Sequence, residues 1–428
     1  MNDNRRFFQY VVPSVGSMLV TGLYFVVDGI FVGRGVGTNG LAAVNLAVPF
    51  ISVLIAVTMM ITMGGASRTS IAFGQKKTEQ ANTTFLTSVC LVLFFSLFMS
   101  AVSVLFPEHI ARLLRASEAL LQDTAVYLKY YVIFGIFFCG AMVLSAFVRN
   151  DGNPQLAFWG MIAGACSNIF LDWLFIFPMH MGIKGAAIAS GLGQVFACLI
   201  LSAHFLLHKG KLRLSVPKIT KAEVLRILHT GIPDTQMNSP VTTFCYNQIV
   251  IRIFGEIGMA AFSVISYLLV IILAVFIGLA QGIQPLLSLS RGEGDLKREH
   301  RILQQGLGFN VFLSLLIYGV MVLFGRTIIG IFNPDAQMIA LGYQYILFYG
   351  TSFPFAAINI VYTTYFLSTG QTKRALQVAV LRSFVLNILF IFAMPAVLGE
   401  SFIWMGITVA EATVMLWLLR KNRRQGSA

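Results

Sequence analysis

Charged residues are scarce in this chain of 428 residues. Asp, Glu, Lys and Arg make up 11% of it and 57% of the residues are hydrophobic, whereas about 25% charged residues are usual in a soluble domain. A soluble core cannot bury that much apolar surface. Many apolar runs exceed about 18 residues, and a helix of that length spans a bilayer core of about 30 Å. The composition therefore predicts a protein embedded in a membrane.

Motifs of metal sites, disulfides and enzyme centres are also missing. The five cysteines fall inside apolar runs without CxxC spacing, so neither a zinc site nor a disulfide framework is indicated, and we read them as packing residues. His204, His208 and His229 lie at or near predicted helix ends without metal-like spacing, and we expect them to be solvated or interfacial. No pair of nucleophile and base is recognisable. The sequence therefore does not indicate an enzyme, and no cofactor is expected.

Positive charge is in excess, with a formal net charge of +13, which raises the question of nucleic-acid binding. The basic residues sit in short segments and tails and not in a patch interleaved with aromatics, so nucleic acid is not expected as a partner. The first apolar run follows Arg5 and Arg6. It is too long for a signal-peptide core and no small-residue cleavage site closes it, so we read it as a spanning helix.

Glycines, prolines and charge clusters divide the chain into twelve predicted spans. A single chain in lipid must satisfy its own backbone hydrogen bonds, and the apolar runs lack the alternation of a membrane barrel, so each span is predicted to be α-helical. The spans cover approximately residues 8–32, 41–66, 83–106, 124–147, 155–177, 185–207, 231–254, 259–287, 302–325, 337–366, 376–398 and 403–419.

Lys and Arg are distributed unevenly between the spans. With the N-terminus inside, the inner segments include six basic residues from Lys209 to Arg226 and four from Arg420 to Arg424. This positive-inside pattern predicts a multi-pass membrane protein with both termini in the cytoplasm. The outer segments carry far fewer basic residues, namely Arg34, Arg112, Arg115, Lys184 and Arg326, with Lys129 close by.

An internal repeat is visible when the chain is cut at its longest basic loop, 208–228. It predicts an N-terminal lobe of six helices (1–207), a cytoplasmic linker (208–228) and a C-terminal lobe of six helices (229–428). Both lobes begin inside, so they should be parallel and face a central cleft, which is an alternating-access design. The matched positions are Pro13 with Pro233, Leu41-Ala42-Ala43 with Met259-Ala260-Ala261, Gly64 with Gly282, Gly74 with Gly292, Gly152 with Gly370 and, after a shift of one residue, Asn168 with Asn387.

Acidic residues inside the predicted spans are few, and each costs at least about 2.5 to 3.5 kcal/mol on insertion scales. Asp28 and Asp172 each lie about five residues from the outer end of their span, and Ser190 lies about six residues below the outer start of its own. All three are therefore at a similar depth, roughly 8 to 10 Å from the outer surface. Asn168 precedes Asp172 by four residues, so the two share one helix face.

Two carboxylates, an amide and a hydroxyl at one level suit a hard cation such as Na⁺. They equally suit a proton, because two acids in one low-dielectric pocket disfavour double ionisation. The alternative is that Asp28 and Asp172 hold helices together by hydrogen bonds to Asn168, although structural contacts seldom need two acids. We expect a cation-coupling site for H⁺ or Na⁺ at Asp28, Asn168, Asp172 and Ser190.

The second half lacks this set of residues. Gln248 stands opposite Asp28, and the stretch opposite Asp172 is apolar. Glu411, about halfway through the last span, is the other acid well inside the membrane. It is either a second protonation site or substrate contact, or a packing residue. The coupling site is therefore expected in the N-terminal half.

The motifs around these residues resemble those of the multidrug and toxic compound extrusion (MATE) family. Together they cover nearly the whole chain, and their combination is far more specific than any single motif. They are Pro13, Asp28 and Phe31-Val32-Gly33-Arg34 in the first span, Arg149-Asn150-Asp151-Gly152-Asn153-Pro154, the stretches from Asn168 to Asp172 and from Gly185 to Ser190, and Gly282-Ile283-Gln284-Pro285 in the second half.

This resemblance implies an exporter in the cytoplasmic membrane of a prokaryote that moves bulky, often cationic organic compounds out of the cell in exchange for H⁺ or Na⁺. The family's proposed cation site maps onto the four residues named above, although the hydroxyl residue is usually Thr where this chain has Ser190. Pro13 is similar to a proline at which the first helix is proposed to bend, and proline permits such a kink. The expected partners are a small-molecule substrate and the lipid bilayer, and a monomer is expected.

Two rival functions share some of these features. A flippase for a lipid-linked precursor would have a similar two-lobe plan but should line its cleft with several Arg or Lys to hold pyrophosphate, and basic residues inside these spans are few. A membrane receptor or channel is disfavoured by the internal repeat and the single acid cluster. A requirement for an ion gradient in vesicles separates an exporter from a receptor or channel.

Overall fold

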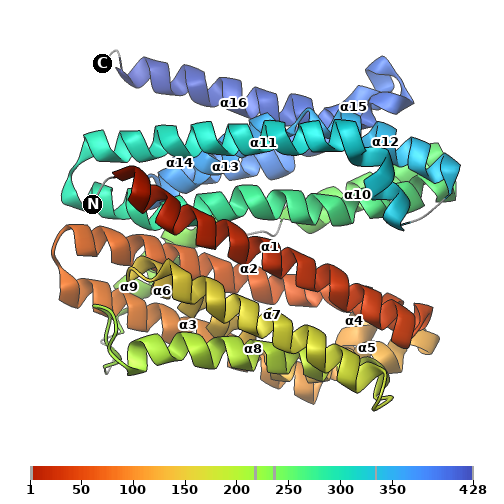
Figure 1. Cartoon of the computed structure of the whole chain (residues 1–428), viewed down its shortest axis with the longest axis horizontal. Coiled ribbons are helices and arrows are strands. Elements are labelled where there is room, and N and C mark those ends of the chain that lie inside the picture. The colour runs from red at the N-terminus through yellow and green to blue at the C-terminus, as the bar shows by residue number, and fades with distance from the viewer. Residues whose placement is uncertain (1–2, 216–218, 235–237, 333–334, 427–428) are drawn as a thin grey trace.

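The computed structural model describes residues 3–215, 219–234, 238–332 and 335–426. These residues are almost entirely helical and contain no strand (Figure 1), which confirms the predicted all-α fold class. The helices are α1 (Asp3–Gly35), α2 (Thr38–Gly74), α3 (Thr78–Leu105), α4 (Pro107–Leu113), α5 (Glu118–Ile133), α6 (Gly135–Asn150), α7 (Pro154–Ile176), α8 (Gly182–Leu206), α9 (Lys221–Gly231), α10 (Asn238–Glu293), α11 (Leu296–Phe332), α12 (Ala336–Gly350), α13 (Phe353–Ser368), α14 (Thr372–Val380), α15 (Leu386–Leu398) and α16 (Met405–Gly426).

Most of these helices are long and apolar enough to cross a membrane. Nine stretches qualify among the described residues, and the bent pairs α5 with α6 and α12 with α13 raise the number to eleven. The seventh predicted span, 231–254, includes residues 235–237, which lie outside the described residues. Of the remainder, Gly231 ends α9, Ile232–Asp234 form a 3₁₀ turn, and residues 238–254 are the first part of α10, which kinks at Gly255, where φ is 64°. Glycine is favoured there because it has no Cβ to oppose a positive φ.

The helices form two groups, which lie one above the other in Figure 1. The two largest hydrophobic clusters follow the same division: one contains residues between Ala43 and Ile227, and the other contains residues between Tyr246 and Ile407. Each half therefore has a core of its own, and the predicted two-lobe plan is confirmed. The limits 1–207, 208–228 and 229–428 stay predictions, and residues 216–218 of the linker lie outside the described residues.

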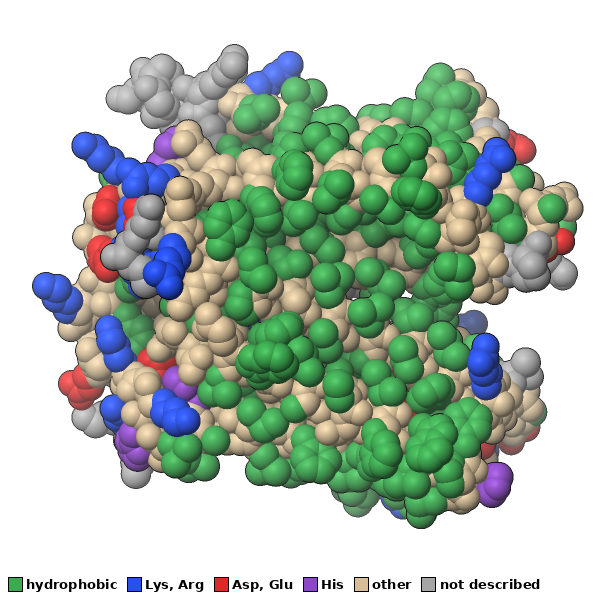
Figure 2. All heavy atoms as spheres, in the orientation of Figure 1, with side chains coloured by type: hydrophobic (Ala, Val, Ile, Leu, Met, Phe, Trp, Pro, Cys, Tyr) green, Lys and Arg blue, Asp and Glu red, His purple; other side chains and the backbone are tan. Residues whose placement is uncertain are grey.

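Helix α1 begins, and α16 ends, at the same end of the molecule, which we call the termini end (Figure 1). On the face drawn in Figure 2, most Lys and Arg side chains gather at this end, while apolar side chains cover the middle. This distribution suits helices that cross a bilayer. The same view shows the surface hollowed between the two halves at the opposite end.

The halves meet at the termini end through helices that have almost no side chain between them. Helix α10 packs against both α1 and α2. Gly74 of α2 and Gly292 of α10 face each other so closely that a Cβ built on Gly292 would lie 2.9 Å from the Cα of Gly74. These glycines are also counterparts in the internal repeat. The contact therefore lies where a two-fold axis relating the halves would pass.

Buried polar side chains join the halves in the same region. The hydroxyls of Ser67 in α2 and Ser288 in α10 are 3.3 Å apart. Arg149 at the end of α6 is buried and donates through Nη2 to Oε1 of Gln281 in α10, over 3.1 Å. Such hydrogen bonds between helices contribute about 0.6 kcal/mol each on average in a membrane. The termini end is therefore closed by both backbone packing and polar contacts.

We expect the substitution Gly292→Leu to force α10 away from α2. The added side chain would meet the backbone of α2, and overpacking of this kind costs about 1–3 kcal/mol, so the purified variant should unfold at a lower temperature than the unmodified protein. The matched control is Gly308→Leu in α11, where an added Cβ would meet nothing within 4 Å. Equal unfolding temperatures for the two variants in the same detergent would contradict the expectation.

Candidate functional site

The four predicted site residues come together inside the N-terminal half. Asp28 comes from α1, Asn168 and Asp172 come from α7, and Ser190 comes from α8. Their exposed fractions are 8%, 0%, 0% and 4% in that order, so all four are withdrawn from solvent. Helix α8 approaches α7 closely because Gly193 lies against Asn168, where a Cβ would be only 2.8 Å from that of Asn168.

A short chain of hydrogen bonds joins three of these residues. Nδ2 of Asn168 donates to Oγ of Ser190 over 3.3 Å, and that hydroxyl donates to Oδ1 of Asp28, also over 3.3 Å. The carboxyls of Asp28 and Asp172 face each other from α1 and α7. The Ser190 hydroxyl therefore orients an acid on one helix relative to an amide on another.

Three buried oxygen atoms of this site accept no hydrogen bond from the described residues. They are Oδ1 of Asn168 and both carboxylate oxygens of Asp172. Leaving a buried acceptor unsatisfied costs about 1–3 kcal/mol, and more for a charged group. Amide and carboxylate oxygens are the ligands that a hard cation prefers. A proton, in turn, makes one carboxyl a hydrogen-bond donor to the other carboxyl. The donor set therefore fits either Na⁺ or H⁺.

Three tyrosines that the sequence reasoning missed surround the acids. Tyr24 of α1 and Tyr127 and Tyr131 of α5 are all buried, and each lies within electrostatic reach of Asp28. The rings of Tyr127 and Tyr131 stack with their centroids 5.4 Å apart. A sequence signal existed, since Tyr24 precedes Asp28 by one helical turn and Tyr127 precedes Tyr131 by another. Their hydroxyls can donate to a carboxylate or accept from a carboxylic acid.

Pro13, the predicted bend of the first span, lies inside α1, which runs as one helix from Asp3 to Gly35. Its carbonyl oxygen accepts a hydrogen bond from Oγ of Ser17 over 2.9 Å. The proline ring has no N–H to donate, so α1 lacks one of its helical hydrogen bonds here. Close by, a Cβ on Gly282 of α10 would lie 2.8 Å from the Cα of Val11. The weakened turn of α1 therefore lies next to the contact between the halves. That α1 bends at Pro13 stays a prediction.

Glu411, the acid singled out in the second half, is part of a buried ion pair. Its Oε1 accepts from Nε of Arg382 over 2.7 Å, and its Oε2 accepts from Nδ2 of Asn359 over 2.7 Å. The exposed fractions of the Arg382 and Glu411 side chains are 21% and 4%. A charge buried in this way needs a partner, and the guanidinium supplies one. The sequence singles out Glu411 but does not identify its partner.

The internal repeat relates Glu411 to the N-terminal site. In the first half, Gly185 is followed four and five residues later by Ala189 and Ser190. In the second half, Gly406 is followed at the same spacing by Ala410 and Glu411. On this match, which is shifted by two more residues relative to that of Asn168 with Asn387, Glu411 stands at the position of the site hydroxyl Ser190. This match escapes notice because every other residue of the two segments differs, and only the glycine and alanine are shared.

A π-helix explains the one-residue shift in the repeat. Relative to the segment from Gly152 to Asn168, one residue is added between Gly370 and Asn387. The added residue falls in a segment that contains a π-helix over Leu381–Val385, between α14 and α15. A π turn accommodates an extra residue without ending the helix, and such turns are frequent at functional sites. Asn387 thus stays in register with Asn168, and the π turn carries the arginine of the ion pair.

Of the two alternatives predicted for His204, solvated or interfacial, the structure excludes the first. The side chain lies near the end of α8 and is buried, with an exposed fraction of 1%, and its Nε2 lies 2.9 Å from Oδ2 of Asp151. Asp151 also accepts hydrogen bonds from the backbone N–H groups of Lys211 and Leu212. These polar partners offset the cost of burial. His208 and His229 are exposed, as predicted.

Comparison with known proteins gives consistent matches over the whole chain. The model of the MatE family matches residues 13–174 and 235–393. A curated relative, the multidrug export protein MepA of Staphylococcus saprophyticus, is 25% identical over 423 residues, which cover 96% of this chain and 93% of the relative.

Solved structures share the fold. A multidrug resistance MATE family transporter, described as an outward-facing conformation, superposes with a TM-score of 0.94 and 19% identity, covering 100% of this chain and 96% of that one. A transporter from Pyrococcus furiosus, whose description reports reverse polarity of the binding pocket and suggests a different function, gives a TM-score of 0.92 and 20% identity, covering 100% and 97%. One fold thus carries pockets of different polarity, so substrate chemistry must be argued from this chain's own residues.

The Arg382 and Glu411 pair allows a double-mutant test. Arg382→Met removes the counter-charge of a buried carboxylate, and breaking a buried pair on one side costs about 3–5 kcal/mol. We expect a clear fall in the unfolding temperature of the purified protein. The double variant Arg382→Met with Glu411→Leu removes both charges and should recover most of the loss. Additive losses in the double variant would contradict a direct interaction between the two side chains.

Proposed function

Because the MatE family model matches more than half of its length, the chain belongs to this family of transporters, and we propose that it exports bulky organic compounds in exchange for H⁺ or Na⁺. It is a transporter and not an enzyme. The observation that carries the proposed coupling is the fully buried carboxylate of Asp172, which faces Asp28 and accepts no hydrogen bond from the described residues.

The electrostatic argument for coupling rests on the close approach of the two acids. An ionised carboxylate inside the membrane is expensive, and two that face each other repel as well. A proton or Na⁺ lowers this cost, whereas a purely structural contact would be cheaper with an amide or hydroxyl in place of one acid. The hydrogen bond from Ser190 to Asp28 and the nearby tyrosines support a site that changes its protonation or ion content during transport.

The proposed cycle uses the separation of the halves. The contacts at the termini end and the hollow at the opposite end support an outward-facing state, with the termini in the cytoplasm. A cation then reaches Asp28 and Asp172 from outside and favours a state of α1 that releases the substrate. Pro13 provides the turn at which α1 bends. The reverse transition exposes the cation to the cytoplasm, where it leaves as a new substrate binds.

The expected substrates are amphipathic organic compounds, cationic ones included, which enter from the cytoplasm or the inner leaflet. The proposal draws on the relative's description as a multidrug export protein. We place the protein in the cytoplasmic membrane of a prokaryote as a monomer. In the C-terminal half, Glu411 is paired with Arg382, and we propose that it contacts substrate or a proton only when that pair opens.

Asp28→Asn and Asp172→Asn should each abolish gradient-driven efflux. Each amide keeps the shape of the side chain but can no longer exchange a proton or balance the charge of Na⁺, so export from proteoliposomes should fall to the rate without a gradient. The measurement is the efflux of a fluorescent organic cation, with pH and Na⁺ gradients imposed separately. The gradient that drives the unmodified protein identifies the coupling ion.

The control for this experiment is Asp123→Asn in α5, an acid outside the site. It should transport at nearly the normal rate, and all three variants should elute from a sizing column like the unmodified protein. Full gradient-driven efflux by both site variants would overturn the proposed coupling role. Loss of efflux in the control as well would show that removing any acid disturbs transport.

A further inference from the structure

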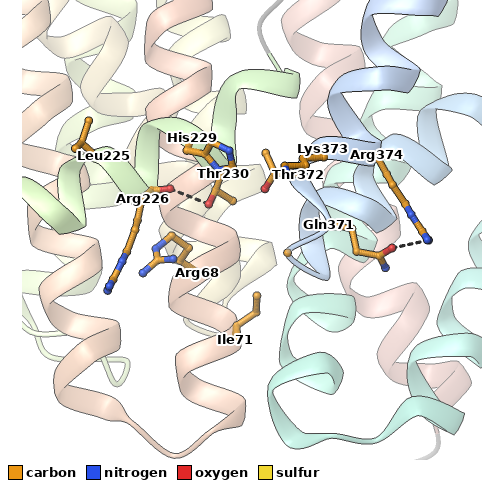
Figure 3. Close-up of a pocket in the computed structure, with 11 residues that line it drawn as sticks. Arg68, Ile71, Leu225, Arg226, His229, Thr230, Gln371, Thr372, Lys373 and Arg374 are labelled. Atoms are coloured by element: carbon orange, nitrogen blue, oxygen red, sulfur yellow. Dashed lines mark hydrogen bonds between the residues drawn. The ribbon is translucent and has the colours of Figure 1, made fainter.

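A basic pocket of about 690 Å³ opens at the termini end (Figure 3), whereas Asp28 and Asp172 lie in the parts of α1 and α7 towards the opposite end (Figure 1). The walls of the pocket come from both halves of the molecule. Arg68 belongs to α2, Arg226 and His229 belong to α9, and Lys373 and Arg374 belong to α14. Figure 3 shows His229 and Lys373 on facing sides of the pocket. The described lining residues include no carboxylate.

Part of this positive charge is held in place by one acid beside the pocket. Glu223 of α9 accepts from Nε and Nη2 of Arg68, with the shortest distance 3.1 Å, and Thr84 of α3 donates to the same carboxylate over 2.7 Å. Arg226 is 3.9 Å from Glu223 and its side chain is 62% exposed. This carboxylate thus holds Arg68 firmly and lies only near Arg226. It carries one negative charge, whereas Arg68, Arg226 and Lys373 each bring a positive one to the pocket.

Two further features favour a phosphate-bearing ligand with an apolar part. Helix α14 begins at Thr372 in the pocket wall, and its N-cap residue Gln371 makes no side-chain cap, so the positive end of the helix dipole adds to the field. Ile71 and the exposed Leu225 contribute apolar surface to the same pocket. Basic pockets between helices on the cytoplasmic side of membrane proteins suit phosphorylated lipid head groups.

We propose that this pocket binds a phosphate-bearing anion, with the head group of an anionic phospholipid of the inner leaflet as its source. Arginine and lysine side chains supply charge-assisted hydrogen bonds to phosphate oxygens, and Leu225 and Ile71 accommodate the start of the acyl chains. In the orientation proposed above, the pocket faces the cytoplasmic leaflet, where anionic lipids attract such clusters.

The position of the pocket gives binding a consequence for transport. Arg226 and His229 lie on α9, which packs against α2 of the N-terminal half, while Lys373 lies on α14 of the C-terminal half. A ligand held by both walls binds best while the termini ends of the two halves are together. It therefore favours the state that is closed at the termini end. The size of this effect is set by the difference between the ligand's affinities for the closed and the open state.

The test uses the full chain in nanodiscs of phosphatidylcholine alone or with phosphatidylglycerol. Phosphatidylglycerol should raise the unfolding temperature, and bound lipid should be visible by native mass spectrometry. In the double variant Arg226→Gln with Lys373→Gln, at least half of the stabilisation should be lost and retention of the lipid should weaken about tenfold. Neither side chain belongs to the proposed coupling site, so proton or Na⁺ dependence of efflux should persist.

The matched control is Lys77→Gln with Lys297→Gln, which removes one exposed cation from each half at the same end of the molecule. It should respond to phosphatidylglycerol like the unmodified protein. Equal responses of the pocket variant and the control would overturn the proposal. A second arm adds inorganic pyrophosphate to phosphatidylcholine nanodiscs: stabilisation that depends on Arg226 and Lys373 would support the anion pocket but assign a soluble phosphate compound as its source.

Discussion

The close packing of α10 against α1 and α2 at one end of the molecule is the contact on which the rest of the structure depends. In lipid, helices gain little from hydrophobic burial against one another, so association rests on backbone approach and buried polar contacts. Gly74 and Gly292 permit that approach, and Ser67, Ser288 and Arg149 supply polar contacts. The halves are therefore held together at this end, although each has a core of its own.

The two halves share a helical plan but balance buried charge differently. In the N-terminal half, Asp28 and Asp172 face each other with no basic side chain among their described hydrogen-bond partners. In the C-terminal half, Glu411 stands at the repeat position of Ser190 and is neutralised by Arg382 from a π turn. The guanidinium takes the place that a transported cation would take beside an acid. In the proposed mechanism one half exchanges a cation, whereas the acid of the other half is already paired with Arg382.

Much of the fold and of the N-terminal site could be predicted from sequence, because apolar runs, basic segments and a polar residue in lipid are each strong local signals. Asp28, Asn168, Asp172 and Ser190 do meet, since their depth and helix face follow from helical geometry. The ion pair of Arg382 with Glu411 and the burial of His204 with Asp151 depend on which distant helices touch, and spacing along one helix does not reveal that. The tyrosines were missed for a different reason: Tyr24, Tyr127 and Tyr131 look like ordinary aromatic residues of a span until an acid is placed beside them.

Helix α1 links the acids to the contact between the halves. It carries Asp28, and about 14 residues earlier it packs Ser14 against Gly278 of α10, a separation of about 21 Å along the axis. Pro13 weakens the helix next to that contact. A cation at Asp28 can bias the two halves only if it stabilises one shape of α1 over another, and a helix with a weak turn at its anchored end offers two such shapes at little cost. The proposed lipid in the basic pocket would stabilise the same contact between the halves, because it binds residues of both halves at the termini end. Its effect does not depend on whether Asp28 and Asp172 are protonated or bind Na⁺. Transport direction would then follow from the ion gradient, while the lipid sets how readily the closed end opens.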